Sequence, residues 1–201
     1  MEHNGHEYVD FGLPSGLKWA TCNVGASTPT EYGDYFMWGS TTPNTNDDYD
    51  WENTPFNNGS SAFNEDYFNS VKDTICPNDV LALEYDAAHE NMGGDWRMPT
   101  LTELFELIDN TNHDWVTDYQ GSSINGVLLT SKVDSRKSIF IPSSGYRDGV
   151  SAFGQGKDAY LWSRSIKKNY DDNAWYLYLY STNCGVNYCG RYDGMCLRGV
   201  F

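Results

Sequence analysis

The sequence predicts an α+β domain with two helices near its middle and short β-strands toward both ends. Apolar residues recur at helical spacing after Thr100 and alternate at strand spacing from Trp175 to Tyr180. Turn-forming clusters of Gly, Asn and Pro separate the apolar segments, and strands grouped around helices without strict alternation are typical of the α+β class. Because the chain has 201 residues and no evident linker, we expect a single domain over residues 1–201.

The first third of the chain predicts a hairpin followed by a long loop. Tyr8–Trp19 holds a Pro-Ser-Gly turn between two short apolar stretches, which indicates a β-hairpin. Residues 41–64 are polar and rich in Asn, which predicts a surface loop. Its carboxylates lack the glycine and the terminal glutamate of a calcium loop, so we interpret them as solvated. They are Asp47, Asp48, Asp50 and Glu52.

Two segments in the middle of the chain predict helices. Asn78–Met92 reads as a short helix that ends at Gly93. A second helix begins after Thr100, which can act as an N-cap, with Glu103 completing a capping box. Its apolar stripe at helical spacing predicts a core-facing side, formed by Leu101, Leu104, Phe105 and Ile108.

The second half of the chain predicts β structure. Val127–Leu129 and Ser138–Ile141 flank a polar turn and indicate a hairpin. We interpret Pro142–Gly149 as a turn region and Tyr160–Ser163 as a further strand.

The C-terminal tail, residues 160–201, has an unusual composition. Between Asn169 and Asp193, 18 of 25 residues are Asn, Tyr, Asp, Ser, Cys or Gly. Side chains alternate between the two faces of a strand, so Leu177 and Leu179 should face the core. Tyr176, Tyr178 and Tyr180 should face the other way and be available for contact.

The formal net charge of -15 argues against nucleic acid and anionic lipid as partners. No apolar run is long enough to cross a membrane, so we expect no membrane insertion. The first ten residues lack the basic and apolar regions of a signal peptide, so we expect either synthesis without one or a missing upstream segment.

Five cysteines leave at least one thiol unpaired, and none shows the CxxC spacing of a metal site. The disulfide state of Cys22, Cys76, Cys184, Cys189 and Cys196 therefore stays open. None of the four histidines has a nucleophile motif beside it in sequence. We expect no catalytic residue, no cofactor and no metal ion.

Several motifs resemble the Fibrobacter succinogenes major paralogous domain, over nearly the whole chain. They are Gly12–Gly16 (GLPSG), Trp19–Ala26 (WATCNVGA), Tyr32–Gly39 (YGDYFMWG), Gly94–Thr100 (GDWRMPT), Ile139–Pro142, Gly145–Arg147 and Leu161–Ser163. This resemblance implies a C-type-lectin-like fold, in which two helices accompany short antiparallel sheets and long loops, and the N- and C-terminal strands come together.

The tail is also similar to the variable regions of proteins that retroelements diversify. The flanks Leu161–Ser165 and Leu197–Phe201 carry this resemblance. In such systems adenines of AAY codons are randomised, and Asn, Tyr, Asp, Ser, Cys and Gly can all arise in this way. The resemblance implies a display protein whose variable side chains, in residues 160–201, bind a ligand.

Tyr and Asn suit a binding surface, since Tyr offers a large amphipathic contact at small entropy cost and Asn adds adaptable hydrogen bonds. We expect a protein or glycan ligand on a cell surface, with the chain located outside the cell on a phage tail-fibre tip or a bacterial surface. The candidate ligand-binding residues are Tyr176, Tyr178, Tyr180, Asn183, Asn187, Tyr188, Tyr192 and Asp193, with Asn169 and Tyr170 at the edge.

Two alternatives remain open at the level of sequence. The first is an undiversified surface adhesin or lectin-like domain of the same family. The second is an oxidase, because formylglycine-generating enzymes share the C-type-lectin-like fold and use a C-terminal cysteine pair. Cys184 and Cys189 have a comparable spacing, although the basic surroundings that would lower a thiol pKa are lacking.

Overall fold

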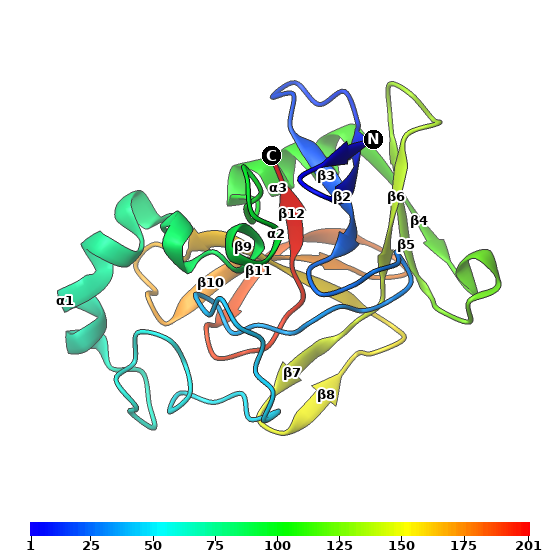
Figure 1. The fold of residues 1–201 in the computed structure, drawn as a ribbon. Helices are drawn as coiled ribbons and strands as arrows, with labels where there is room; N and C mark the ends of the chain where they lie inside the picture. The colour runs from blue at the N-terminus through cyan, green and yellow to red at the C-terminus, as the bar shows by residue number, and fades with distance from the viewer.

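The computed structural model describes all 201 residues and has an α+β architecture of three α-helices and four small antiparallel sheets (Figure 1). The first sheet joins the two ends of the chain, because the last strand pairs with the third. Its strands, in spatial order, are β1 (Glu2–His3), β2 (His6–Asp10), β3 (Lys18–Asn23) and β12 (Arg198–Val200). The antiparallel pairing of β2 with β3 confirms the predicted N-terminal hairpin.

The predicted tail forms most of a second sheet of order β11-β10-β9. Its strands are β9 (Ala159–Ile166), β10 (Asn173–Leu179) and β11 (Cys184–Gly190). A third sheet contains β4 (Thr111–Val116), β5 (Gly126–Ser131) and β6 (Ser138–Pro142), and the pairing of β5 with β6 confirms the predicted hairpin there. The segment interpreted as a turn instead contains β7 (Tyr146–Asp148), which pairs with β8 (Ser151–Phe153).

The chain has three helices where the sequence predicted two. The unpredicted helix is α1 (Glu65–Ile75), which Asn64 caps by accepting from the backbone N–H of Tyr67. The segment Asn78–Met92 becomes helical only at α2 (Ala87–Met92), since Asp86 supplies the N-cap there. Short 3₁₀ turns precede it, at Pro77–Asp79 and Leu83–Tyr85, and a third lies at Tyr119–Gly121.

The second predicted helix is α3 (Leu101–Asn110), and its Thr100–Glu103 capping box is present. Leu104 and Leu107 form its buried side, whereas Phe105 is 47% exposed, so its assignment to the core was wrong. Phe105 follows Leu104 by one residue, which turns it about 100° away from the buried side of a 3.6-residue helix. None of the helices has the length and apolar character needed to cross a bilayer.

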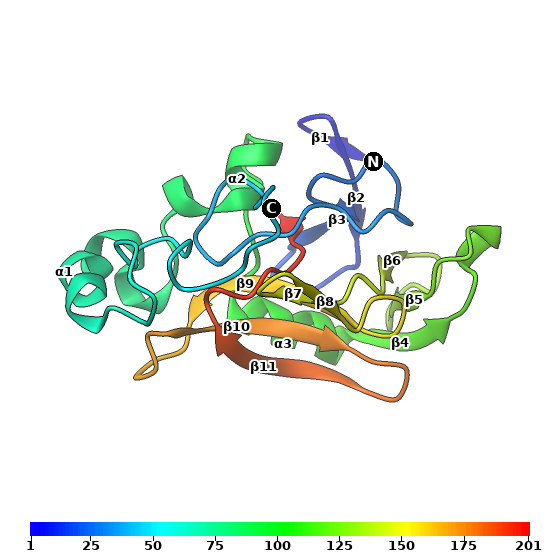
Figure 2. The same cartoon turned by 90° about the horizontal axis from the view of Figure 1, so that it is seen from below.

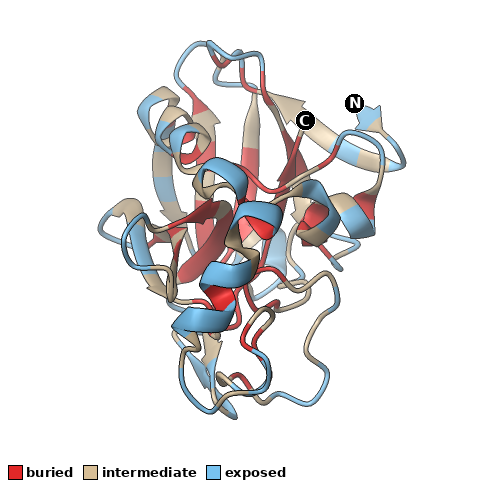
Figure 3. Cartoon of the chain, turned by 90° about the vertical axis from the view of Figure 1, so that its left-hand side faces the viewer, coloured by how far each residue is buried: buried red, intermediate tan, exposed pale blue.

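The β9–β10–β11 sheet separates two apolar clusters. Helix α3 lies against one face, where Leu104 and Leu107 join Leu161, Leu177 and Leu179 (Figure 2). The other face supplies Tyr160, Trp162 and Tyr176 to a cluster that also includes residues of α1 and α2. Figure 3 shows the helices exposed on their outer sides, with buried strands behind them.

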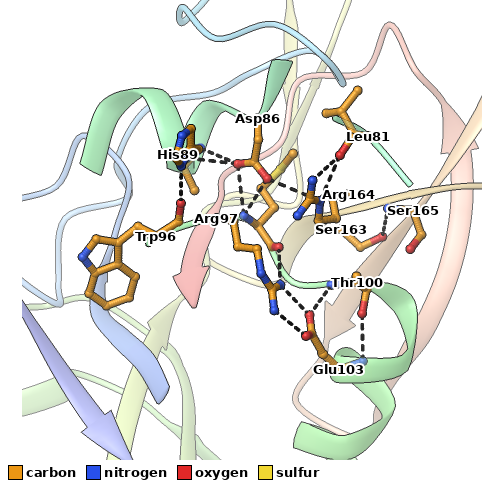
Figure 4. A network of polar contacts seen from close by, with 12 residues as sticks. Leu81, Asp86, His89, Trp96, Arg97, Thr100, Glu103, Ser163, Arg164 and Ser165 are labelled. Atoms are coloured by element: carbon orange, nitrogen blue, oxygen red, sulfur yellow. Dashed lines mark hydrogen bonds and ion pairs between the residues drawn. The ribbon is translucent and has the colours of Figure 1, made fainter. Parts of the chain in front are cut away.

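A buried polar network fixes β9 against the two central helices (Figure 4). Asp86 is fully buried and accepts hydrogen bonds from the backbone N–H groups of Ala88, His89 and Met98. The Nε of Arg164, in β9, lies 3.7 Å from a carboxylate oxygen of Asp86 and donates to the carbonyl of Leu81. Because the partners come from α2, from the segment before α3, from the segment before α2 and from β9, this network sets the position of β9 and hence of the tail sheet.

A second part of the network holds the start of α3. Arg97 donates from both terminal nitrogens to the carboxylate of Glu103, at 2.8 and 2.6 Å. The Ser165 hydroxyl, in β9, accepts from the backbone N–H of Leu101. Arg97 and the fully buried Trp96, both in the motif Gly94–Thr100, are therefore part of the structural scaffold.

The 41–64 segment contains no helix or strand, as predicted, but it is anchored to the protein at several points. Tyr49 and Asn57 are buried, and Tyr49 pairs with Gly149. Trp51 and Phe63 pack around the guanidinium of Arg191, whose central carbon lies 4.2 Å from the ring centre of Phe68. This loop therefore covers part of the tail.

Candidate ligand-binding site

The strand alternation predicted for the tail is present. Leu177 pairs with Val186 and Leu179 with Cys184, all on the side covered by α3. Tyr176 pairs with Asn187 and Tyr178 with Gly185 on the opposite side, which we call the tyrosine face. Gly185 leaves room for the Tyr178 ring, since a Cβ on Gly185 would lie 2.6 Å from the Tyr178 hydroxyl.

A cavity of about 250 Å³ lies on the tyrosine face. Its walls come from β7, β9, β10, β11 and the segments that follow β10 and β11. The lining residues are Tyr146, Tyr160, Tyr176, Tyr180, Cys189, Asp193 and Met195. Tertiary packing brings these residues together, since Tyr146 and Tyr180 are distant in the sequence.

The aromatic rings around this cavity form one continuous cluster. The ring centre of Tyr160 lies 5.2 Å from that of Tyr146, 5.8 Å from that of Tyr176 and 5.9 Å from that of Tyr180. All three contacts are edge-to-face, a geometry that aromatic pairs favour. The Tyr160 hydroxyl also donates to the Tyr180 hydroxyl at 3.3 Å. These contacts hold the walls of the cavity in place.

Asp193 gives the cavity its only carboxyl group. The residue is 6% exposed and takes part in no ion pair. Burial raises the pKa of Asp193 to about 7, the Cys189 thiol offsets part of this rise, and the Asp148 carboxylate adds to it. Burial likewise raises the pKa of the Cys189 thiol well above its usual value, so this thiol is protonated at neutral pH.

Two of the predicted contact residues are buried, which corrects the expectation that the whole tyrosine face is exposed. Tyr176 is 8% exposed and Asp193 is 6% exposed, because the β7–β8 hairpin and residues 194–196 close over this part of the sheet. Both nevertheless line the cavity. Tyr178, Tyr180 and Tyr192 are half-buried around it.

The remaining predicted residues are exposed, but they do not all share one face. Asn187 lies on the tyrosine face, opposite Tyr176, and Asn183 lies in the turn between β10 and β11. Tyr188 pairs with Trp175 on the side covered by α3. Asn169 and Tyr170 belong to the turn between β9 and β10.

Tyr170 and Tyr188 belong to a separate aromatic patch. Their ring centres are 6.2 Å apart, and Trp175 contacts Tyr188 edge-to-face at 5.3 Å. The Lys167 ammonium lies 4.5 Å from the ring centre of Trp175 and 4.9 Å from that of Tyr188. The candidates therefore divide between the tyrosine face and the end of the opposite face.

The sequence interpretation missed three walls of the cavity, namely Tyr146, Tyr160 and Met195. Tyr146 stands in the motif Gly145-Tyr146-Arg147, which drew attention only as a family resemblance. Tyr160 is the first residue of the predicted strand Tyr160–Ser163. Nothing local in these segments indicates that their side chains meet across three strands.

Two of the three tail cysteines, Cys184 and Cys189, lie on opposite faces of β11. Cys184 belongs to the apolar cluster under α3, and Cys189 lines the tyrosine cavity. Their separation of five residues places them on opposite sides of a strand, and all five cysteines are free thiols. Cys184 and Cys189 are therefore not neighbours in this structure.

Cys184 has instead a histidine neighbour that the sequence did not reveal. Its Sγ lies 3.2 Å from Nδ1 of His113 in β4, and Nε2 of His113 lies 3.2 Å from the Thr111 hydroxyl. Burial raises the pKa of Cys184 and lowers that of His113. Both shifts favour the neutral thiol and the neutral imidazole, whereas a cysteine nucleophile requires the thiolate.

No three His, Cys, Asp or Glu side chains are grouped so as to hold a metal ion. A comparison of the chain with known protein families, with curated proteins and with solved structures found no match.

Proposed function

We propose that this protein is a non-catalytic binding protein that recognises a protein or glycan on a cell surface through its tyrosine face. The observation that carries the proposal is the continuous cluster of tyrosine rings around the cavity, with half-buried Tyr178, Tyr180 and Tyr192 beside it.

The chemistry of this surface favours recognition. Tyrosine rings that are held by ring contacts lose little conformational entropy when they bind, and they offer both apolar area and a hydroxyl. Exposed Asn183 and Asn187 supply adaptable hydrogen-bonding groups near these rings. A rigid aromatic centre with polar groups around it is the usual composition of a protein-binding surface.

We further propose that the fold is C-type-lectin-like and that retroelement mutagenesis diversifies the tail. The pairing of β12 with β3 agrees with the joined termini of that fold, although three helices are present instead of two. Burial of Leu177, Leu179 and Leu197 beside exposed Asn183 and Asn187 fits a fixed scaffold that carries changeable positions.

The diversification proposal has a genomic test. We expect the gene to lie near a reverse-transcriptase gene and near a second copy of the DNA that encodes residues 160–201. The two copies should differ only where the template has adenine. A neighbourhood without such a copy would favour the undiversified adhesin of the same fold.

The binding proposal is tested with labelled protein and a panel of bacterial strains, measured by flow cytometry. Replacing Tyr178, Tyr180 and Tyr192 together with Ser should abolish binding to the recognised strains. The matched control replaces Tyr67 and Phe105 with Ser, since both are exposed aromatic residues outside the tyrosine face. Undiminished binding by the triple variant would contradict the proposal.

A further inference from the structure

We propose that the tyrosine cavity accepts an organic ammonium group, such as the protonated amine of a lysine side chain or an amino sugar. This inference rests on the proposed binding function and names the chemistry of the group that enters the centre of the surface.

The first support is the surroundings of Asp193. Its side chain lies in the wall of the cavity, the residue is 94% buried, and it has no basic partner. Asp148, on the neighbouring β7, adds a second negative charge close enough to raise its pKa. A buried carboxylate without a cation is costly, so an incoming cation would relieve that cost.

Two arginines lie close to Asp193, Arg191 in the sequence and Arg147 through its pairing with Gly194, and both guanidinium groups lie against aromatic rings instead of Asp193. The Arg147 guanidinium carbon lies 4.9 Å from the ring centre of Tyr35. Arg191 is fully buried among Trp38, Trp51, Phe63 and Phe68, and it donates to the carbonyls of Asp171 and Pro55. Neither arginine forms an ion pair with Asp193, and the neighbouring charge that acts on its pKa is the Asp148 carboxylate.

The second support is the aromatic wall. Four tyrosines line a space of about 250 Å³, which suits a short alkylammonium ion. Aromatic faces attract cations, and the effect is largest where water is excluded. A divalent metal ion fits less well, because the Cys189 thiol is protonated at neutral pH and Asp193 is the only carboxyl in the lining.

The pH dependence of ammonium binding provides an independent test of the role of Asp193. None of the titratable groups that influence the pKa of Asp193, or whose pKa Asp193 influences, is basic. They are Cys189, Asp148, Tyr146, Tyr176 and Tyr192. Because the pKa of Asp193 is about 7, the carboxyl is mostly neutral at lower pH and charged at higher pH. Binding of a cation should release a proton, and its affinity should rise about tenfold from roughly pH 6 to pH 8.

The test is isothermal titration calorimetry of the full chain with n-butylammonium chloride, and with 1-butanol as the neutral comparison. We expect saturable binding of butylammonium and none of butanol at the same concentration. Asp193→Asn should weaken butylammonium binding by about tenfold or more, since it removes a charged hydrogen-bond partner. Asp73→Asn is the matched control, because it removes an exposed carboxylate on α1.

A second variant guards against misfolding of Asp193→Asn. Tyr180→Leu keeps an apolar wall but removes a half-buried ring, and it should weaken butylammonium binding by about threefold. Circular dichroism checks that each variant is folded. Equal binding of butanol and butylammonium, or full affinity in folded Asp193→Asn, would overturn the inference.

The failure of this inference can be told apart from failure of the proposed function. If butylammonium does not bind but the Tyr178, Tyr180 and Tyr192 triple variant still loses binding to cells, only the ammonium assignment is wrong. If butylammonium binds as expected while the triple variant binds cells normally, the cavity is an ammonium site and the proposed surface is wrong.

Discussion

The two faces of the β9–β10–β11 sheet are built from alternate residues of the same strands, yet they are packed differently. The face under α3 presents Leu177 and Leu179, which are almost wholly buried against Leu104 and Leu107. The tyrosine face is covered only in part, and its rings surround a cavity. A helix that lies along a sheet packs closely against it. The hairpin and loops on the other face cover the sheet incompletely, and the space that remains is lined by tyrosine rings.

The largest expected effect is on the face under α3. Leu177→Ala should lower the free energy of unfolding by about 3–5 kcal/mol, since a fully buried leucine leaves a cavity that its neighbours fill only in part. Urea unfolding followed by fluorescence measures this. Tyr178→Ser on the half-buried opposite side is the comparison, and a loss as large as that of Leu177→Ala would mean that the two faces are equally part of the core.

The next effect comes from the buried carboxyl of the tyrosine face. Folding raises the pKa of Asp193 from 3.8 to about 7. At a pH between these two values the carboxyl is protonated in the folded state and ionised in the unfolded state. Its contribution to stability is therefore present at low pH and is lost as pH rises toward 7, by up to about 4 kcal/mol. Thermal unfolding at several pH values should show this decline in the wild type.

Asp193→Asn cannot release a proton and should remove this part of the pH dependence. The variant should therefore be more stable than the wild type at pH 8 and similar at pH 4. Asp73→Asn, with an exposed carboxylate, should follow the wild-type curve. A parallel decline in Asp193→Asn would assign the effect to another group.

The comparison of the two faces also explains what the sequence could predict. The period of two from Trp175 to Tyr180 identified both faces, because strand geometry requires it. The capping box at Thr100 identified α3 for a similar local reason. In each case the signal lies within a few residues and needs no knowledge of the rest of the fold.

The cavity had no such signal. Its walls include Tyr146, Tyr160 and Met195, which meet only after β7, β9 and the segment beyond β11 have packed together. Asp193 was predicted as a contact residue from the composition of the tail, which does not show that the residue is buried. The contact between His113 and Cys184 joins strands 71 residues apart. Helix α1 was missed although its apolar residues lie on one side, because its average composition is polar and its capping Asn64 lies within an Asn-rich loop.

A smaller effect on stability is expected at the end of the face under α3, where Tyr188 is exposed. Lys167 lies over Trp175 and Tyr188, so Lys167→Gln should lower stability by about 0.5–1 kcal/mol through loss of cation–π attraction. Lys168→Gln is the control, since Lys168 is exposed and this substitution removes the same charge. Binding to cells should be unchanged in Lys167→Gln, and a loss of binding would extend the ligand surface around the edge of the sheet to Tyr170 and Tyr188.

The smallest effects should come from the exposed asparagines near the cavity. Asn183→Ser and Asn187→Ser should each change the free energy of unfolding by less than about 0.5 kcal/mol, because their side chains are exposed and outside the core. Thermal unfolding measures this, and Tyr176→Ser provides a buried comparison on the same face, opposite Asn187. Tolerance at Asn183 and Asn187 together with loss of stability at Tyr176 would divide the tyrosine face into changeable outer positions and a fixed floor. If instead Asn187→Ser destabilises the protein as much as Tyr176→Ser, the exposed positions are part of the scaffold, and a display function that depends on changing them becomes untenable.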